Sequence, residues 1–283
     1  VDDETIFKAI REHEIAPYVQ LVIAQSNDPR APPYNLGFYG TNNKFLAVDI
    51  KNQFLELNRE LSLRDVNTIC VGSDGDSRFL SAQKSIVNFG TAYEFAEFEF
   101  AGDVSNEIQM NQDPLHIEKK LKTSLFDLCN ELRMGKFIAS INHLIILYQN
   151  SPKIEHGLLT SDLDPRDKMN YSCIRKICDK KVLDLLHNIP EAKGTKIFLE
   201  LINHIHVAFV EKNVDVKQRI LNGAIAVGFI RQWRQWLFEN KIPVYKHFIT
   251  QNSWDGIELD FIMLINFAHR GKAFMIEELT SQK

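Results

Sequence analysis

The sequence predicts an α/β segment followed by a mostly helical one. Two apolar runs, Tyr18 to Gln25 and Thr68 to Val71, are rich in β-branched residues and have the composition of buried strands. Between them, apolar residues from Phe45 to Leu61 recur near the helical spacing, which predicts an amphipathic helix. After Asp113 strand-like runs become scarce and segments of helical length follow one another. The predicted class is therefore α/β plus all-α.

These patterns divide the chain into an α/β part over residues 1–130 and a helical part over 131–283. The first part also contains a short predicted strand near Leu36 to Tyr39. A further predicted strand runs from Glu94 to Phe100, where acids alternate with phenylalanines. From Asp113 onward we expect helices over 115–132, 136–149, 166–187, 195–211, 216–239 and 255–270.

Composition indicates a globular protein of 283 residues, with 45% hydrophobic and 25% charged residues. No apolar run reaches membrane-spanning length, so no membrane is expected as a partner. The four cysteines are few and unpatterned, which favours a reduced intracellular compartment over a disulfide framework. The chain begins at Val1 with no visible targeting peptide, and we interpret it as a fragment.

A short apolar run ends abruptly in two carboxylates, Asp74 and Asp76, on either side of Gly75. Glycine permits a tight turn there, so the acids would project from the tip of a strand. Oxygen ligands of this kind suit a hard divalent cation that also bridges phosphate. Turn chemistry is the alternative, because Asp in such a turn often bonds its own backbone, and it is the favoured interpretation for Asp76.

A second acidic motif follows some forty residues later. Asp113 and Pro114 stand where a helix would begin, and His116 falls within its first turn. Asp74, Asp76 and Asp113 are the candidate metal ligands, with Asp74 as the candidate catalytic acid and His116 in support. For Asp113 a simple helix cap remains the alternative.

Basic residues gather just after this motif, at Lys119, Lys120 and Lys122. The formal net charge of -4 does not exclude a local basic face for nucleic acid. These lysines are therefore candidate DNA contacts, and a solvated helix face is the alternative interpretation.

Other motifs favour structural roles. The spacings of the pairs Cys173/Cys178 and His204/His206 do not match a structural zinc site. The sequence has no glycine-rich phosphate loop, and the pairs at Gly135 and Gly194 are interpreted as helix caps. The two tryptophans at 233 and 236 share one side of a predicted helix, which favours a core position over base stacking.

Taken in order, these motifs resemble the catalytic core of P-element-like, THAP-type DNA transposases. The resemblance is stronger to transposon-derived animal proteins related to those transposases, and it covers nearly the whole chain. The motifs that carry it are Ile23-Ala-Gln25, Pro32-Pro33, Gly40-Thr-Asn-Asn-Lys-Phe45, Ser73-Asp-Gly-Asp-Ser-Arg78, Asp113-Pro-Leu-His116, His156-Gly157, Ser161-Asp162, Arg231-Gln-Trp-Arg-Gln-Trp236, Phe248-Ile-Thr-Gln-Asn252 and Ile257-Glu-Leu259.

The resemblance implies a ribonuclease-H-like core interrupted by a helical insertion, in which three acids bind Mg²⁺ for DNA strand cleavage and transfer. Asp74 would be the second acid. The first and third would lie on segments outside the given sequence, so an incomplete, inactive fragment is expected. DNA is the expected partner, a homo-oligomer is a further expectation, and the implied location is nuclear. The alternative is a domesticated module that binds DNA or protein without catalysis.

Two points separate the sequence from the better-known members of this family. Those members carry Lys-Asn after the Asp-x-x-His motif, where this chain has Lys119-Lys120. The insertion of P-element transposase binds guanine nucleotide, which makes GTP a candidate ligand here, but no local signature in this sequence supports that transfer.

Overall fold

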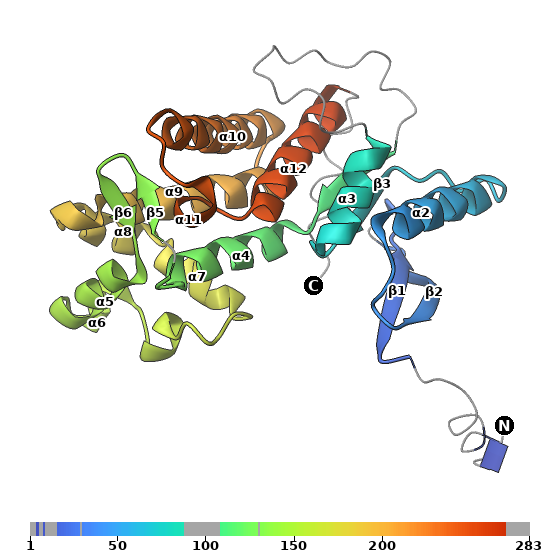
Figure 1. Ribbon diagram of the computed structural model, residues 1–283, viewed down its shortest axis with the longest axis horizontal. Coiled ribbons are helices and arrows are strands. Elements are labelled where there is room, and N and C mark those ends of the chain that lie inside the picture. The colour runs from blue at the N-terminus through green and yellow to red at the C-terminus, as the bar shows by residue number, and fades with distance from the viewer. Residues whose placement is uncertain are drawn as a thin grey trace.

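The computed structural model describes residues 4, 5, 8, 16–28, 30–87, 108–129 and 131–269. These residues form a mixed structure of many helices and small sheets (Figure 1). The strands of the first half lie toward one end and the helices of the second half toward the other. The strand expected at 94–100 lies outside the described residues.

The first sheet is an antiparallel hairpin of β1 (Tyr18–Ala24) and β2 (Tyr34–Thr41). Both strands and the helix that follows, α2 (Ala47–Ser62), lie where the sequence predicted them. The expected burial of the first strand is wrong, because Val19, Leu21 and Ile23 are exposed. A hydrogen bond of 2.9 Å between Gln20 and Gln53 joins β1 to α2. Most of the apolar side chains of the hairpin are exposed, with Phe38 at 71%.

The second sheet pairs two short strands in parallel, β3 (Cys70–Ser73) and β4 (Gln109–Gln112). Each strand is followed by a helix, α3 (Ser77–Ile86) after β3 and α4 (Pro114–Phe126) after β4. Strand β3 begins two residues later than predicted, and its side chains are only half-buried. The expected burial on both faces is therefore wrong. Among the described residues β3 pairs with β4 alone.

The second half is helical, as expected, with one small hairpin inserted. Helix α10 has the predicted bounds. The elements are β5 (Leu132–Met134), β6 (Phe137–Ala139), α5 (Ile141–Asn150), α6 (Lys153–His156), η2 (Thr160–Leu163), α7 (Tyr171–Ile177), α8 (Lys180–His187), η3 (Pro190–Ala192), α9 (Lys193–Phe209), α10 (Val216–Glu239), α11 (Val244–His247) and α12 (Gln251–His269).

Two regions of this half differ from the sequence prediction. The hairpin β5–β6 replaces the end of one predicted helix and the start of the next. Gly135 has a φ of +62° and forms the turn of this hairpin, so its interpretation as a helix cap is wrong. The predicted helix over 166–187 is divided into α7 and α8, because Asp179 caps a new helix by accepting a hydrogen bond from the N–H of Lys181.

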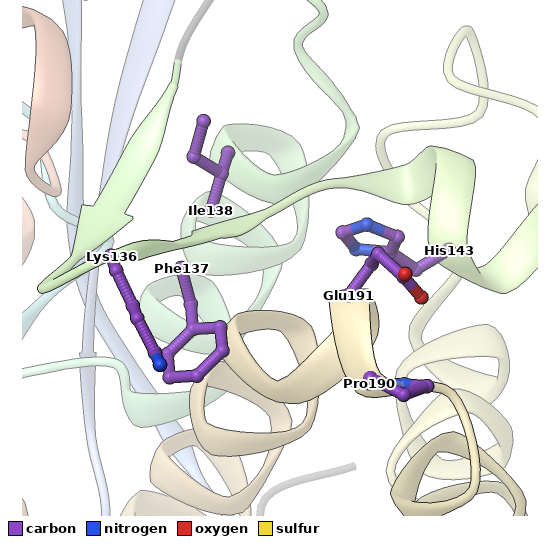
Figure 2. A pocket seen from close by; sticks show the side chains of 6 residues that line it. All are labelled: Lys136, Phe137, Ile138, His143, Pro190 and Glu191. Atoms are coloured by element: carbon purple, nitrogen blue, oxygen red, sulfur yellow. The ribbon is translucent and has the colours of Figure 1, made fainter.

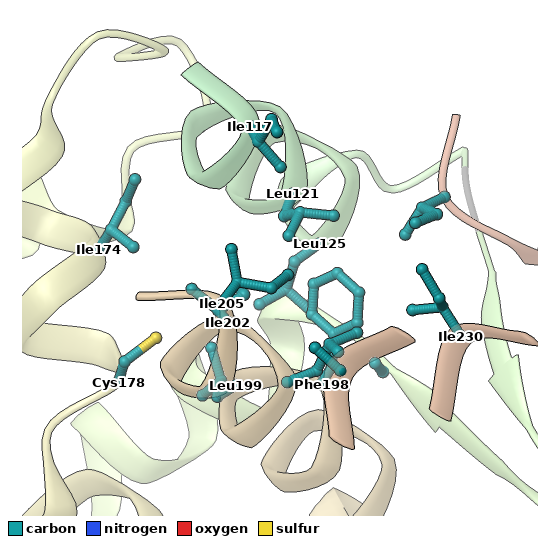
Figure 3. Packing of buried hydrophobic residues seen from close by; sticks show 14 of the residues in the cluster. Ile117, Leu121, Leu125, Ile174, Cys178, Phe198, Leu199, Ile202, Ile205 and Ile230 are labelled. Atoms are coloured by element: carbon teal, nitrogen blue, oxygen red, sulfur yellow. The ribbon is translucent and has the colours of Figure 1, made fainter. Parts of the chain in front are cut away.

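The main hydrophobic core lies among the helices from α4 onward, around α4 and α9 (Figure 3). Helix α9 contributes Phe198, Ile202 and Ile205, which are fully buried between α4 and α10. Trp233 of α10 packs against Phe198, which confirms its predicted core position. A second, smaller cluster consists of Leu80, Met110 and Leu259.

A buried polar cluster lies inside the helical core. Glu118 of α4 is completely buried, and its Oε1 lies 3.0 Å from Nδ1 of His206 on α9. The hydroxyl of Tyr171 on α7 lies 3.0 Å from the same nitrogen. Burial, with Glu118 nearby, raises the pKa of Tyr171. This cluster ties three helices together.

Helix α12 joins the two halves of the chain through three buried acids. Asp255 accepts a hydrogen bond of 2.6 Å from Nζ of Lys84 on α3. Glu258 binds Arg231 on α10. Asp260 accepts a hydrogen bond of 2.8 Å from the backbone N–H of Gln112 on β4. A helix from the end of the sequence therefore packs on the strand and helix that carry the first motifs.

Within the described parts of the chain, the structure contains no helix with the length and apolar composition needed to cross a bilayer.

The close approach of α9 to β6 leads to the first prediction. A Cβ at Gly194 would lie 2.8 Å from the carbonyl of Ile138, and backbone there cannot move aside easily. We expect Gly194→Ala to lower the free energy of unfolding by about 1 to 3 kcal/mol. Urea denaturation measures this change. Gly228→Ala in α10 is the matched control, because no atom lies within 4 Å of its added Cβ. It should stabilise by up to about 1 kcal/mol.

Candidate functional site

Two predicted acids meet at the carboxyl ends of the parallel strands. Ser73 pairs with Gln112 as the last residues of β3 and β4, and the N–H of Asp113 donates to the carbonyl of Ser73 over 2.8 Å. Asp74 and Asp113 therefore follow neighbouring strand ends. We call Asp74, Asp76 and Asp113 together the acid edge.

Asp113 begins α4 as the sequence predicted. Its Oδ1 accepts a hydrogen bond of 2.9 Å from the N–H of Leu115, and Pro114 occupies the first helical position. His116 lies in the first turn. Capping uses one carboxylate oxygen of Asp113, so the capping role and a ligand role are compatible.

Asp74 and Asp76 surround a glycine that the backbone requires. Gly75 has a φ of +86°, a region that side-chain-bearing residues rarely adopt. Asp74 is exposed, and its Oδ1 lies 3.4 Å from the N–H of Asp76. The exposed carboxylate is the one best placed to meet a ligand from solvent.

Asp76 has a structural role. It caps α3 by accepting a hydrogen bond of 2.8 Å from the N–H of Arg78, whose guanidinium also binds both carboxylate oxygens. These bonds to Arg78 lower the pKa of Asp76. The same guanidinium donates to Asn43 and lies 4.0 Å above the ring centre of Phe45. Asp76 thus holds the loop before α2 in place.

Lys120 reaches the acid edge from the second turn of α4. Its Nζ donates to the carbonyl of Gly75 over 2.6 Å, between the two acids of the loop. Burial lowers the pKa of Lys120, while the charges of Asp74 and Asp76 oppose that shift. A positive charge therefore lies within the acid edge.

His116 lies between the acids and the lysines. Burial, followed by the charge of Lys120, lowers the pKa of His116, and the carboxylates of Asp74 and Asp113 oppose this only in part. This shift favours the neutral imidazole.

The three predicted DNA-contacting lysines have different positions. Lys119 is half-exposed on α4. Lys120 is bound to Gly75, as described above. Lys122 is only 2% exposed, and its Nζ donates to the carbonyl of Asp167 over 2.5 Å. The structure contradicts the prediction that Lys122 contacts DNA, because its ammonium group is buried in the helical core.

Gln112 fills the space behind the acid edge. Its side-chain oxygen would lie 3.3 Å from a Cβ at Gly75 and 2.7 Å from a Cβ at Gly256 of α12. The side chain is 1% exposed, and neither its amide nitrogen nor its oxygen has a hydrogen-bond partner among the described residues. Gln112 therefore spaces the loop of Gly75 from α12.

Asp260 of α12 binds the same strand end through the N–H of Gln112. A role for this residue was not predicted from the sequence. It is completely buried, and its second oxygen has no hydrogen-bond partner within the described ranges. Burial raises the pKa of Asp260 well above its ordinary value, against the hydrogen bond from Gln112, and Asp113 adds to the rise. The available signal was an acid within the apolar run Leu259 to Leu264.

The remaining motifs lie away from the acid edge. Cys173 donates to the carbonyl of Asp162, and burial raises its pKa to about 11. His204 binds Asn222. Thr195 of the Gly-Thr-Lys segment binds Ser140 and His143. None of these groups faces the candidate site.

A shallow pocket lies beside this last segment, at the turn of hairpin β5–β6 and the start of α9 (Figure 2). Burial lowers the pKa of His143 there, and nearby Glu191 opposes the shift. The pocket has no carboxylate cluster and no phosphate-binding loop. Its lining residues are Lys136, Phe137, Ile138, His143, Pro190 and Glu191.

Comparison of the structure with solved proteins finds a chain of the Drosophila P element transposase strand transfer complex. The TM-score is 0.68 and the sequence identity is 12%. The fold is transposase-like. The match covers 95% of this chain and 64% of that transposase chain, so the sequence spans less than two thirds of it. No family model and no curated protein matches the sequence.

The acid edge does not fit a self-sufficient magnesium site. Magnesium is usually held by one or two carboxylates together with waters and substrate phosphates. Here Asp76 is committed to Arg78, and Lys120 places an ammonium beside Asp74. Among the residues that the structure describes, no group of three or more His, Cys, Asp or Glu side chains could hold a metal ion.

The buried acid at 260 leads to the second prediction. A raised pKa means that the folded chain holds this proton more tightly than the unfolded chain. Stability is therefore lost as the pH rises above the ordinary Asp value of about 4. We expect Asp260→Asn to stabilise the protein at pH 8 by about 1 to 3 kcal/mol, the usual cost of a buried polar group that lacks a partner. The gain should shrink at pH 5, as measured by urea denaturation.

Asp255→Asn is the control on the same helix. It removes a carboxylate that is paired with Lys84, so it should destabilise the protein at both pH values. An Asp260→Asn variant that loses stability at pH 8, as the control does, would contradict the interpretation of Asp260 as a buried acid with a raised pKa.

Proposed function

We propose that this chain is the core of a transposase-derived protein that acts on DNA and is related to enzymes of metal-dependent strand cleavage and transfer. The observation that carries the proposal is the position of Asp74 and Asp113 at the ends of neighbouring parallel strands. In α/β sheets such strand ends are the usual place for a site. The transposase-like fold over nearly the whole chain supports the same conclusion.

The finer features of the proposal follow from the sequence motifs. They are a ribonuclease-H-like core of the THAP-type family, a helical insertion from about residue 131, and a nuclear location. Asp74 is the proposed catalytic acid. A complete magnesium site would need acids beyond those that the described residues place at the acid edge. Strand chemistry is therefore proposed for the whole protein rather than for this chain alone.

DNA would reach the acid edge near two cations, the half-exposed Lys119 and the exposed Lys44. Lys119 lies on α4 beside His116, and its charge contributes to the lowered pKa of that residue. Lys44 is exposed in the loop that Arg78 anchors through Asn43. Both ammonium groups could neutralise phosphates.

A second candidate function is a domesticated module that binds DNA or protein without catalysis. The observation that favours it is the internal compensation of the acids by Arg78 and Lys120. Under this alternative the fold is kept and the metal chemistry is lost. Self-association and GTP binding stay predictions from the resemblance.

The third prediction concerns DNA binding. We expect the chain to bind duplex DNA with an affinity that falls steeply with KCl, because phosphate contacts release counterions. Lys119→Glu and Lys44→Glu should each weaken binding and lower the slope of log affinity against log salt by about one. Fluorescence anisotropy with a labelled duplex measures both. Lys217→Glu changes an exposed lysine at the start of α10, is the matched control and should bind as the wild type does. Absence of any salt-dependent binding would exclude the DNA proposal and favour a protein-binding module.

The fourth prediction concerns strand cleavage. The chain as given should not nick supercoiled plasmid in 10 mM MgCl₂ above background, on the order of concentrations used to fill weak magnesium sites. A longer form that supplies further acids should nick it, and Asp74→Ala should abolish that activity. Cleavage by the short chain that persists in Asp74→Ala would contradict the assignment of Asp74.

A further inference from the structure

We infer that Lys120 acts as a tethered cation that neutralises the acid edge and keeps divalent metal ions from binding there in this chain. The inference deepens the proposed function, because it concerns the same acids. It does not depend on DNA binding. It assigns the unusual second lysine of Lys119-Lys120 a role that its neighbour does not share.

The geometry places the ammonium inside the acidic loop. Lys120 starts one helical turn after His116, so its side chain points back along α4 toward the start of the helix. Nζ ends 2.6 Å from the carbonyl oxygen of Gly75. A Cβ at Gly75 would lie 2.8 Å from that nitrogen. Glycine at 75 therefore serves both the turn and the approach of the lysine.

The neighbouring charges explain why the ammonium stays there. Asp76 already shares its charge with Arg78, which leaves Asp74 and Asp113 as the uncompensated acids of the edge. The carboxylates of Asp74 and Asp76 both act on Lys120, through space rather than by direct contact. One fixed cation thus acts on Asp74, the exposed acid of the loop.

A divalent ion at the acid edge would compete with the ammonium group of Lys120 for the same position and the same carboxylates. The Gly75 carbonyl, which could itself serve as an oxygen ligand, is occupied by the lysine. Repulsion between the ammonium and a nearby doubly charged ion acts at a partly buried position, where water screens it only in part. Lys120 therefore opposes metal binding through both its contact and its charge.

The experiment compares variants of the lysine without DNA. Lys120→Met removes the charge and keeps most of the length, whereas Lys120→Arg keeps the charge. Lys119→Met is the matched control, one residue earlier on the same helix. Mn²⁺ binding is measured by isothermal titration calorimetry, and the melting temperature is measured with and without Mn²⁺.

Wild type, Lys119→Met and Lys120→Arg should bind Mn²⁺ weakly and melt at nearly the same temperature with or without the ion. Lys120→Met should bind at least tenfold more tightly and melt at a higher temperature when Mn²⁺ is added. The double variant Lys120→Met/Asp74→Asn should lose the added affinity, which would locate the ion at the acid edge. If Lys120→Met does not fold, Lys120→Gln takes its place.

Two outcomes would overturn the inference. One is tight Mn²⁺ binding by the wild type, and the other is equally weak binding by wild type and the uncharged variants. Neither outcome depends on the anisotropy measurements, so a failure of DNA binding and a failure of this inference are distinguishable.

Discussion

The hydrogen bond that Asp260 accepts from the backbone of Gln112 fixes the end of β4, and the acid edge depends on it. Strand β4 has four residues and, among those described, pairs only with β3. Two short strands are marginal without further packing. Helix α12 supplies that packing, and its bond between Glu258 and Arg231 connects it to α10. The helical half of the chain thus sets the spacing of the acids that the first half carries.

Charge compensation at the acid edge orients side chains more than it stabilises the fold. The pair Arg78 and Asp76 is partly exposed, and such pairs are worth at most about 1 kcal/mol. Its value lies in the several contacts that one guanidinium makes, to the cap of α3, to Asn43 and to Phe45. The buried acids of α12 differ from this pair in their partners. Asp255 and Glu258 each have a cation, whereas Asp260 has only a backbone donor.

Much of the helical part could be predicted from apolar spacing and caps. Helix α10 has the predicted bounds because Asp215 caps its start, and Asp113 and Pro114 mark the start of α4 in the same way. Hairpin β5–β6 could not be predicted so directly. Its strands have only three residues each, and the carbonyl of Arg133 accepts a hydrogen bond from Trp233, a contact across 100 positions of the chain. Such long-range contacts leave little trace in local pattern.

The positions of Asp74 and Asp113 could be predicted from the sequence, but the positions of the lysine charges around them could not. Strand tips and a helix start located Asp74 and Asp113, and parallel pairing brought them together. That Lys122 turns inward and Lys120 turns back to Gly75 depends on the rotation of α4 against its neighbours, which spacing alone does not fix.

The spacer between the acid edge and α12 is an uncharged side chain held between two glycines. Dissolved ions alter the field around Asp74 and Asp113 within a Debye length of about 8 Å at physiological strength. Dissolved ions have no comparable effect on Gln112, because its contacts with Gly75 and Gly256 are steric. Salt can therefore change how strongly Asp74 and Asp113 attract a charged ligand, while the steric packing of Gln112 between the two glycines stays the same.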